Sequence, residues 1–131
     1  MGSWPGGISA ITLFVEDLEA SKAFYQRAFG LPVFYEDPNS AVFQFNDTVI
    51  NLLDINEAPS LIDPARVASP DAGHRFQFTL AVDDVDAMVS ELRARGVEIL
   101  NGPIDRPWGL RTAAFADPDG HIWEVAAKIA A

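Results

Sequence analysis

The sequence of 131 residues contains no cysteine and only two histidines. The lack of cysteine excludes disulfide bonds, thiolate nucleophiles and thiolate metal sites. Basic residues are also scarce, because nine lysines and arginines stand against nineteen aspartates and glutamates, for a net charge of −10. This acidic balance argues against a nucleic-acid partner or an anionic membrane surface, and it favours cationic ligands.

Long hydrophobic runs are absent as well. No apolar stretch approaches the length that spans a bilayer, and the sequence does not start with a basic segment followed by an apolar one. We therefore expect a cytoplasmic protein without a membrane partner. Hydrophobic residues make up 49% of the chain, which at this length is enough for one compact domain over 1–131, or for two small half-domains that share a core.

What is present is a repeat. Each half of the sequence predicts a strand, an aspartate that caps a helix, a glycine that ends the helix, and three further strands. In the first half, Asp17 and Gly30 flank a helix over 18–29, and in the second half Asp84 and Gly96 flank a helix near 84–95. The strands are predicted at 8–15, 32–36, 41–45, 48–53, 74–82, 97–100, 112–116 and 122–126.

The fold class that this repeat predicts is α+β, with tandem βαβββ modules over about 8–54 and 74–127. We expect their curved sheets to form a cleft, with the two helices outside. The residues between the modules, 55–73, are rich in proline and small polar residues and predict a linker or a long covering loop. A second loop rich in proline and glycine is predicted over 101–109.

The last two strands are joined by Asp117-Pro118-Asp119-Gly120, a sequence typical of a hairpin turn. Alternation on the final strand then places Glu124 in the middle of an apolar face, and places His121 and Trp123 on the opposite, helix-covered face. A carboxylate in such surroundings needs a partner, so Glu124 is a candidate site residue. For His121 and Trp123 we favour structural roles.

The repeat also indicates which side chains share a cleft. Ala10 and Gln77 occupy equivalent positions in the first strands of the two modules, and Asn51 and Glu124 are equivalent in the last strands. Opposed sheets would bring these four positions towards one point. The predicted ligand-binding face contains Thr12, Phe14, Asn51, Gln77, Thr79 and Glu124.

Trp108 and Arg111 lie in and next to the loop before the last hairpin. Trp108 either covers the core or stacks on a ligand. Arg111 either binds a ligand or forms a salt bridge with an acidic neighbour, and the salt bridge is the favoured alternative.

Two segments, ITLFVEDLEASKAFYQRAFGLPV from Ile11 and FADPDGHIWEVA from Phe115, resemble the vicinal oxygen chelate superfamily. This superfamily includes glyoxalases, extradiol dioxygenases, fosfomycin-resistance enzymes and bleomycin-resistance proteins. The resemblance covers 8–127 and implies the same fold. The segment Pro107-Trp108-Gly109, followed by Arg111, is similar to that of bleomycin-resistance-type members.

In metal-dependent members of this superfamily, the positions matching Ala10, Asn51, Gln77 and Glu124 bind one divalent ion. Here only Glu124 is a typical ligand and Gln77 is a weak candidate. A catalytic ion needs about three protein ligands, and an alanine supplies none. We therefore expect neither a bound metal nor another cofactor.

The resemblance favours a metal-free protein that binds, and by binding sequesters, an aromatic or cationic small molecule. The alternative is a lyase, isomerase or dioxygenase that depends on a divalent ion such as nickel, zinc, manganese or iron. A metal-free enzyme with Glu124 as a general base is the third hypothesis. We also expect a homodimer, because one module is too small to bury both faces of its sheet and because family members pair modules across chains.

Overall fold

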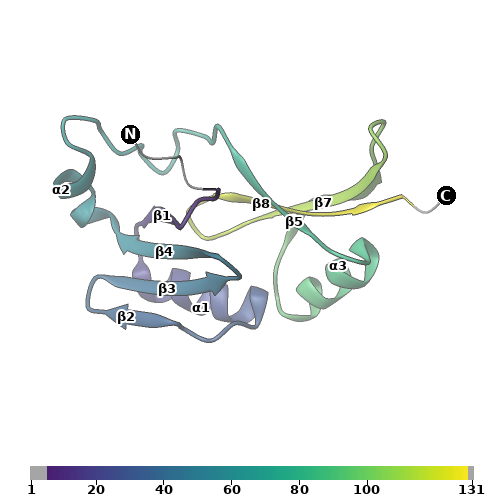
Figure 1. Ribbon diagram of the computed structural model, residues 1–131, viewed down its shortest axis with the longest axis horizontal. Helices are drawn as coiled ribbons and strands as arrows, with labels where there is room; N and C mark the ends of the chain where they lie inside the picture. Colours follow the sequence, from purple (N-terminus) through teal and green to yellow (C-terminus); the bar gives the residue numbers. More distant parts are fainter. Residues whose placement is uncertain (1–5, 130–131) are drawn as a thin grey trace. The chain divides into compact units, whose positions relative to one another are not determined.

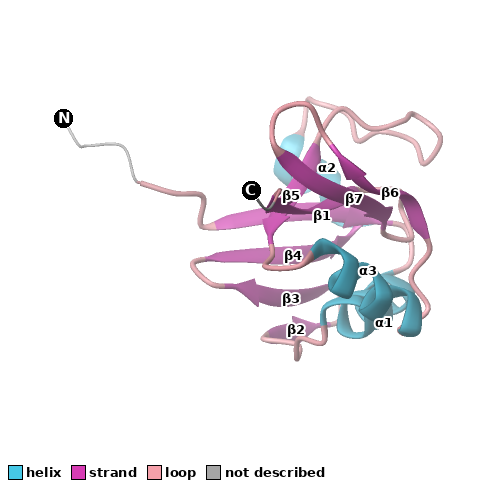
Figure 2. Ribbon diagram, turned by 90° about the vertical axis from the view of Figure 1, so that its right-hand side faces the viewer, coloured by secondary structure: helices cyan, strands magenta, loops and turns pink. Residues whose placement is uncertain are grey.

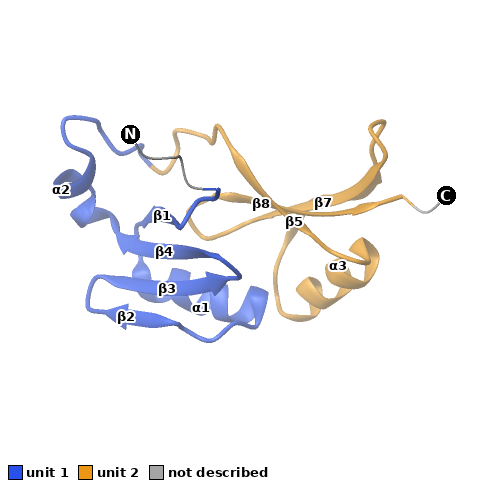
Figure 3. Cartoon of the chain, in the orientation of Figure 1, with its two compact units in different colours: residues 1–69 blue, residues 70–131 orange. Residues whose placement is uncertain are grey.

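The structure is a computed structural model that describes residues 6–129. The chain divides into two compact units, Met1–Ser69 and Pro70–Ala131, here called unit 1 and unit 2 (Figure 3). Each unit contains a four-stranded sheet and one longer helix (Figures 1 and 2). In both units the first and last strands of the module pair in parallel and the other pairings are antiparallel. The predicted α+β repeat is therefore confirmed.

Unit 1 orders its strands β1-β4-β3-β2. Its helix α1 packs against β3 and β4, where Tyr25 stacks on Phe43 with ring centroids 5.8 Å apart. Leu13, Val15 and Leu52 are buried in the same core. The elements are β1 (Ala10–Val15), α1 (Leu18–Phe29), β2 (Tyr35–Asp37), β3 (Ser40–Phe45) and β4 (Thr48–Asp54).

Unit 2 repeats this order as β5-β8-β7-β6. Helix α3 packs against β6, β7 and β8. Trp123 is 1% exposed and contacts Phe78 at a ring distance of 4.8 Å, so its predicted core position is confirmed. The elements are β5 (Gln77–Ala81), α3 (Val85–Ala94), β6 (Ile99–Asp105), β7 (Leu110–Ala116) and β8 (Ile122–Lys128).

Both predicted helices begin at the predicted aspartate. The Asp17 side chain accepts a hydrogen bond from the Ala20 N–H at 3.1 Å, and Asp84 accepts one from the Ala87 N–H at 3.0 Å. These bonds satisfy backbone donors that the first turn of a helix leaves without a partner. Gly30 ends α1 with a φ of 64°, in the left-handed region that favours glycine.

Several strand boundaries differ from the prediction. β1, β2 and β5 each begin two or more residues later than the hydrophobic alternation suggests. The predicted linker is also partly helical, with a 3₁₀ turn η1 (Ile55–Glu57) and a short helix α2 (Ala58–Ile62). Asp54, the last residue of β4, caps the 3₁₀ turn by accepting from the Asn56 N–H, and Pro59 stands at the start of α2, where proline is tolerated.

The predicted loop over 101–109 is wrong in its first half, because β6 continues to Asp105. A true loop remains at Pro107, Trp108 and Gly109, where Arg106 N–H donates to the Leu110 carbonyl and Gly109 N–H donates to the Arg106 carbonyl. Gly109 has a φ of 91°. This is a three-residue hairpin loop with glycine in the left-handed position, and it joins β6 to β7.

No helix among residues 6–129 is long and apolar enough to cross a membrane.

Candidate functional site

Glu124 lies half-buried on β8, where its backbone position pairs with Thr79 of β5 and with Ala114 of β7. The Thr79 hydroxyl donates a hydrogen bond to Glu124 Oε1 at 2.9 Å. Directly opposed residues in neighbouring strands point to the same face of a sheet. Thr79, Glu124 and Ala114 therefore share one face of the unit 2 sheet, which we call the Glu124 face.

Unit 1 carries an equivalent pair. Asn51 of β4 is opposite Thr12 of β1, and Asn51 Nδ2 approaches Thr12 Oγ1 at 3.4 Å. Asn51 Oδ1 is buried, and no residue among 6–129 donates a hydrogen bond to it. A buried acceptor without a donor costs about 1–3 kcal/mol, so the Asn51 amide lowers the stability of unit 1 by an amount of this order.

The remaining residues of the predicted binding face follow the same alternation within their own units. Phe14 lies two residues after Thr12 on β1 and is half-buried, and Gln77 lies two residues before Thr79 on β5 and is exposed. Ala10 is exposed at the start of β1. The predicted convergence of Ala10, Asn51, Gln77 and Glu124 on one point stays a prediction.

Arg111 lies on the opposite face of the unit 2 sheet from Glu124. Its guanidinium donates to both carboxylate oxygens of Asp86 on α3 at 2.9 Å, and to Asp105 at 3.0 Å. These bonds raise the pKa of Arg111, and the bonds from Arg111 lower the pKa of Asp86. The predicted salt bridge is confirmed, whereas the role of Arg111 in ligand binding stays a prediction.

A shallow surface hollow of about 350 Å³ adjoins this salt bridge at the start of α3. Its polar lining is acidic apart from Arg111 and Lys128, and Arg111 already has two carboxylate partners there. We therefore do not place the candidate site in this hollow.

Trp108 is 67% exposed at the tip of the β6–β7 hairpin. Of the two alternatives for this residue, the one in which it covers the core is wrong, because a covering side chain would be largely buried. Its role in ligand stacking stays a prediction.

Arg106 is a residue that the sequence analysis missed. Its Nε–H donates to Thr112 Oγ1 at 2.9 Å, and its Nη2 approaches Asn101 Oδ1 at 3.4 Å. Thr112 is opposite Ala126, and Asn101 is opposite Ala114. Both partners of Arg106 therefore lie on the Glu124 face. The sequence predicted an irregular loop around Arg106, although Pro107-Trp108-Gly109 repeats the Pro-x-Gly pattern of the last hairpin.

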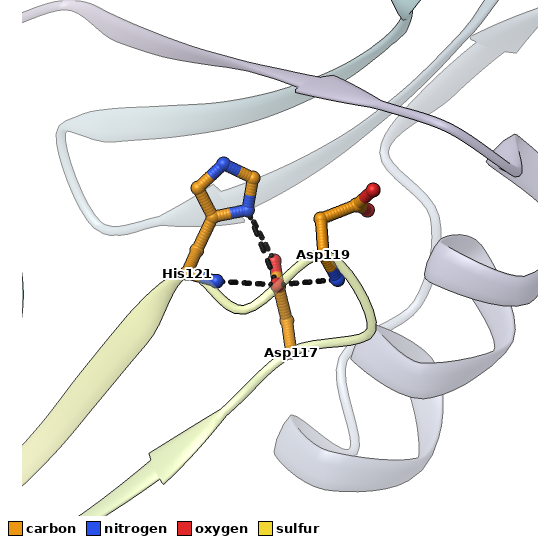
Figure 4. Close-up of side chains that lie close together, drawn as sticks. All are labelled: Asp117, Asp119 and His121. Carbon is orange, nitrogen blue, oxygen red and sulfur yellow. Dashed lines mark hydrogen bonds and ion pairs between the residues drawn. The ribbon is translucent and has the colours of Figure 1, made fainter. Parts of the chain in front are cut away.

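His121 and Asp117 form a compact group at the β7–β8 turn (Figure 4). The Asp117 side chain is fully buried, and its Oδ1 accepts hydrogen bonds from the N–H groups of Asp119 and His121 at 3.0 and 2.8 Å. His121 Nδ1 lies 2.9 Å from Asp117 Oδ2. Partial burial lowers the pKa of His121, but the hydrogen bond to Asp117 and the charges of Asp117 and Asp119 outweigh it, so the pKa is raised overall.

Asp117, Asp119 and His121 place potential metal-ligand atoms within 4.8 Å of one another. However, both Asp117 oxygens already accept bonds from N–H groups or the imidazole of this turn. A cation would have to replace these bonds. The group is therefore a brace of the hairpin, as the predicted structural role of His121 implies.

Comparison with known proteins decides the family. The model of the Glyoxalase/Bleomycin resistance protein/Dioxygenase superfamily matches residues 7–125. The chain belongs to this superfamily. Among curated relatives, YraH of Bacillus subtilis is 31% identical over 88% of this chain and 93% of its own length. The metallothiol transferase FosB of Lysinibacillus sphaericus is 29% identical over 89% of this chain and 79% of its own length.

Solved structures of the superfamily have the same fold. A glyoxalase/bleomycin resistance protein/dioxygenase from Nocardioides aligns with a TM-score of 0.86 and 28% identity, over 98% of this chain and 87% of its own. TnmS3 from Streptomyces sp. CB03234, an antibiotic binding protein, aligns with a TM-score of 0.71 and 26% identity, over 98% of this chain and 100% of its own.

The donor set of this chain does not fit the divalent metal of the metal-dependent members. Ala10 has no donor atom, Asn51 and Gln77 offer only neutral amides, and Glu124 supplies the single carboxylate. A catalytic ion with open positions takes about three imidazole or carboxylate ligands. We therefore derive no chemistry through a metal at these positions.

Proposed function

We propose that this protein binds a small, planar organic molecule with hydrogen-bond donors or a positive charge, and that it does so on the Glu124 face without a catalytic metal. One observation carries the proposal. Glu124 Oε1 accepts a bond from Thr79, whereas Oε2 has no hydrogen-bond partner among residues 6–129. A half-buried carboxylate with a vacant acceptor is suited to a charge-assisted bond from a ligand, and such bonds are stronger than neutral ones.

Two further observations support a planar ligand. Trp108 offers an exposed aromatic surface in the same unit, and aromatic rings stack on flat or cationic molecules with about 0.5–2 kcal/mol of stabilisation. The similarity to TnmS3, which is an antibiotic binding protein, supports a small organic ligand for this chain. Sequestration of an aromatic or cationic compound is the function that these features support best.

Isothermal titration calorimetry with bleomycin and a panel of planar aromatic amines would test this proposal. Glu124→Gln keeps the shape of the side chain and removes its charge, so we expect affinity to fall about tenfold, the effect of losing one charge-assisted bond. Trp108→Ala should weaken binding by a similar factor. Glu98→Gln is the matched control, because Glu98 is exposed and precedes β6. Equal affinity in all variants, or binding of anionic diketones and catechols alone, would contradict the proposal.

The alternative function is a metal-dependent lyase, isomerase or dioxygenase. The match to a metallothiol transferase over most of both chains favours metal dependence, whereas the donor set argues against a bound metal. Thermal shift with nickel, zinc, manganese and iron(II) separates the two functions, and we expect no saturable stabilisation. A rise of several degrees that saturates near one ion per chain, and that Glu124→Ala abolishes, would establish the alternative.

A further inference from the structure

Arg106 is a cation whose fixed position is not explained by an ion pair. None of the carboxylates among residues 6–129 forms an ion pair with it, in contrast to Arg111 and its two aspartates. Its guanidinium uses one N–H for Thr112 and one for Asn101. A guanidinium has five N–H donors, so the side chain is held in place while most of its donors stay available.

The strand register shows where these donors lie. Thr79, Glu124, Ala114 and Asn101 are successive partners across β5, β8, β7 and β6, and they form one row on the Glu124 face. Ala114 is the shortest side chain of this row. Glu124 and Asn101 stand on either side of it, separated by two strand spacings, or about 10 Å at the backbone. The row therefore has a carboxylate at one side of Ala114 and the guanidinium of Arg106 at the other.

We infer that Arg106 is a second ligand anchor and that the natural ligand is bipolar. Its donor or cationic end meets Glu124, and its acidic end, a carboxylate or a similar oxyanion, meets Arg106. This inference rests on the proposed binding function of the Glu124 face and adds a requirement for an anionic group. The planar fork of Arg106, already oriented by Thr112 and Asn101, is suited to an oxyanion because little further ordering is needed on binding.

Three matched probes separate the two ends of the ligand: benzylamine, benzoate and 4-(aminomethyl)benzoate, whose rigid ring carries both charges. Titrations followed by nitrogen–proton NMR report both affinity and location. We expect 4-(aminomethyl)benzoate to bind about tenfold more tightly than benzylamine, because it gains one charge-assisted contact. The Arg106 Nε–H signal should move with both carboxylates and stay in place with benzylamine.

Variants distinguish a ligand contact from a structural role. Arg106→Gln should remove the advantage of 4-(aminomethyl)benzoate over benzylamine and leave the affinity for benzylamine unchanged. Arg106→Lys should restore part of this advantage, because it keeps the charge and loses the planar fork. Arg93→Gln is the control, since Arg93 is an exposed arginine of α3. Melting temperatures of all variants show whether the hairpin stays intact.

The outcomes separate this inference from the proposed function. If benzylamine binds through Glu124 but the carboxylate adds no affinity, or if the added affinity survives in Arg106→Gln, the role of Arg106 is wrong and the proposed function stands. If the Arg106 Nε–H signal does not move with either carboxylate, the role is also wrong. If none of the probes perturbs β5–β8 at concentrations of about 10 mM, where fragment-sized ligands still bind, both the role and the proposed function are contradicted.

Discussion

Replacement of Asp117 by alanine should destabilise unit 2 more than any substitution on its exposed surface. The carboxylate is fully buried, and it accepts bonds from two backbone N–H groups and from the His121 ring. Alanine removes all three bonds at once. Alanine also lacks the side chain that suits the first position of this turn. Aspartate is favoured there because its carboxylate accepts a hydrogen bond from the backbone N–H two residues further on.

The magnitude follows from the two backbone donors. A buried N–H that loses its acceptor costs about 1–3 kcal/mol. Both N–H groups are only partly buried, so water satisfies them in part and the lower half of this range applies. We therefore expect a loss of about 2–4 kcal/mol in the free energy of unfolding. For a chain of this size, that loss lowers the melting temperature by roughly 10 °C.

Urea unfolding followed by circular dichroism measures this loss, with Asp117→Asn and Glu98→Ala alongside. Asparagine keeps one side-chain oxygen for the backbone donors and loses the charge that attracts His121, so at least half of the stability should return. Glu98→Ala should change stability by less than about 0.5 kcal/mol. If Asp117→Ala behaves like Glu98→Ala, the hydrogen bonds drawn in Figure 4 do not brace the hairpin.

Three other predictions concern pH, the α3 salt bridge and assembly. The pKa of His121 is raised above its ordinary value of 6.5, so the ion pair of the protonated imidazole with Asp117 stabilises the fold below that pH. This stabilisation is lost as the pH rises through the folded-state pKa. The free energy of unfolding should therefore decline across this range, and His121→Gln should remove the decline. Arg111→Met should lower the melting temperature by a few degrees at low salt and by less at high salt, because the Asp86 and Asp105 partners are exposed and salt screens exposed charges. A loss that does not depend on salt would contradict an electrostatic cause. We also propose a homodimer, because single modules are too small to bury both sheet faces; sedimentation that shows a stable monomer at micromolar concentration would contradict it.

Local chemistry made much of the fold predictable from the sequence. Asp17 and Asp84 cap their helices, and Asp117-Pro118-Asp119-Gly120 forms the predicted hairpin, with Gly120 at a φ of 87° and its N–H bonded to the Asp117 carbonyl. In each case a short segment fixes its own geometry through one side chain or one glycine. Such features do not depend on distant parts of the chain.

The β6 strand shows where this approach fails. Gly102 and Pro103 predicted a loop, yet both lie within β6. β6 is an edge strand, and Pro103 falls within the register shift between Asn101 and Ile104, where it has no partner residue in β7. Proline is tolerated at edge strands and at such irregularities because no ladder hydrogen bond is lost. Gly102 is required by a close approach, because a Cβ there would lie 2.5 Å from the Thr112 carbonyl oxygen. An edge position is a property of the whole sheet, and the local sequence does not reveal it.

The same limit explains why Arg106 was missed and Glu124 was found. Glu124 stands on a regular strand after a recognisable turn, so simple alternation assigns its face. The direction of Arg106 depends on the bulges of β6 and on the Arg106-Pro107-Trp108-Gly109 hairpin, which has the same hydrogen-bond pattern as the hairpin at Asp117. Proline and glycine occupy equivalent positions in both loops. The shared Pro-x-Gly pattern was the available signal, and it predicts a second hairpin there.

The repeat allows the polar pairs at equivalent positions of the two units to be compared. Each unit places a threonine opposite a polar residue of its last strand, Thr12 with Asn51 and Thr79 with Glu124. The amide of Asn51 is neutral, whereas Glu124 is a carboxylate, and Arg106 adds the opposite charge to the same face of unit 2. Charge-assisted bonds are roughly twice as strong as neutral ones. Bonds from a ligand to Glu124 or Arg106 should therefore be stronger than a bond to the neutral amide of Asn51.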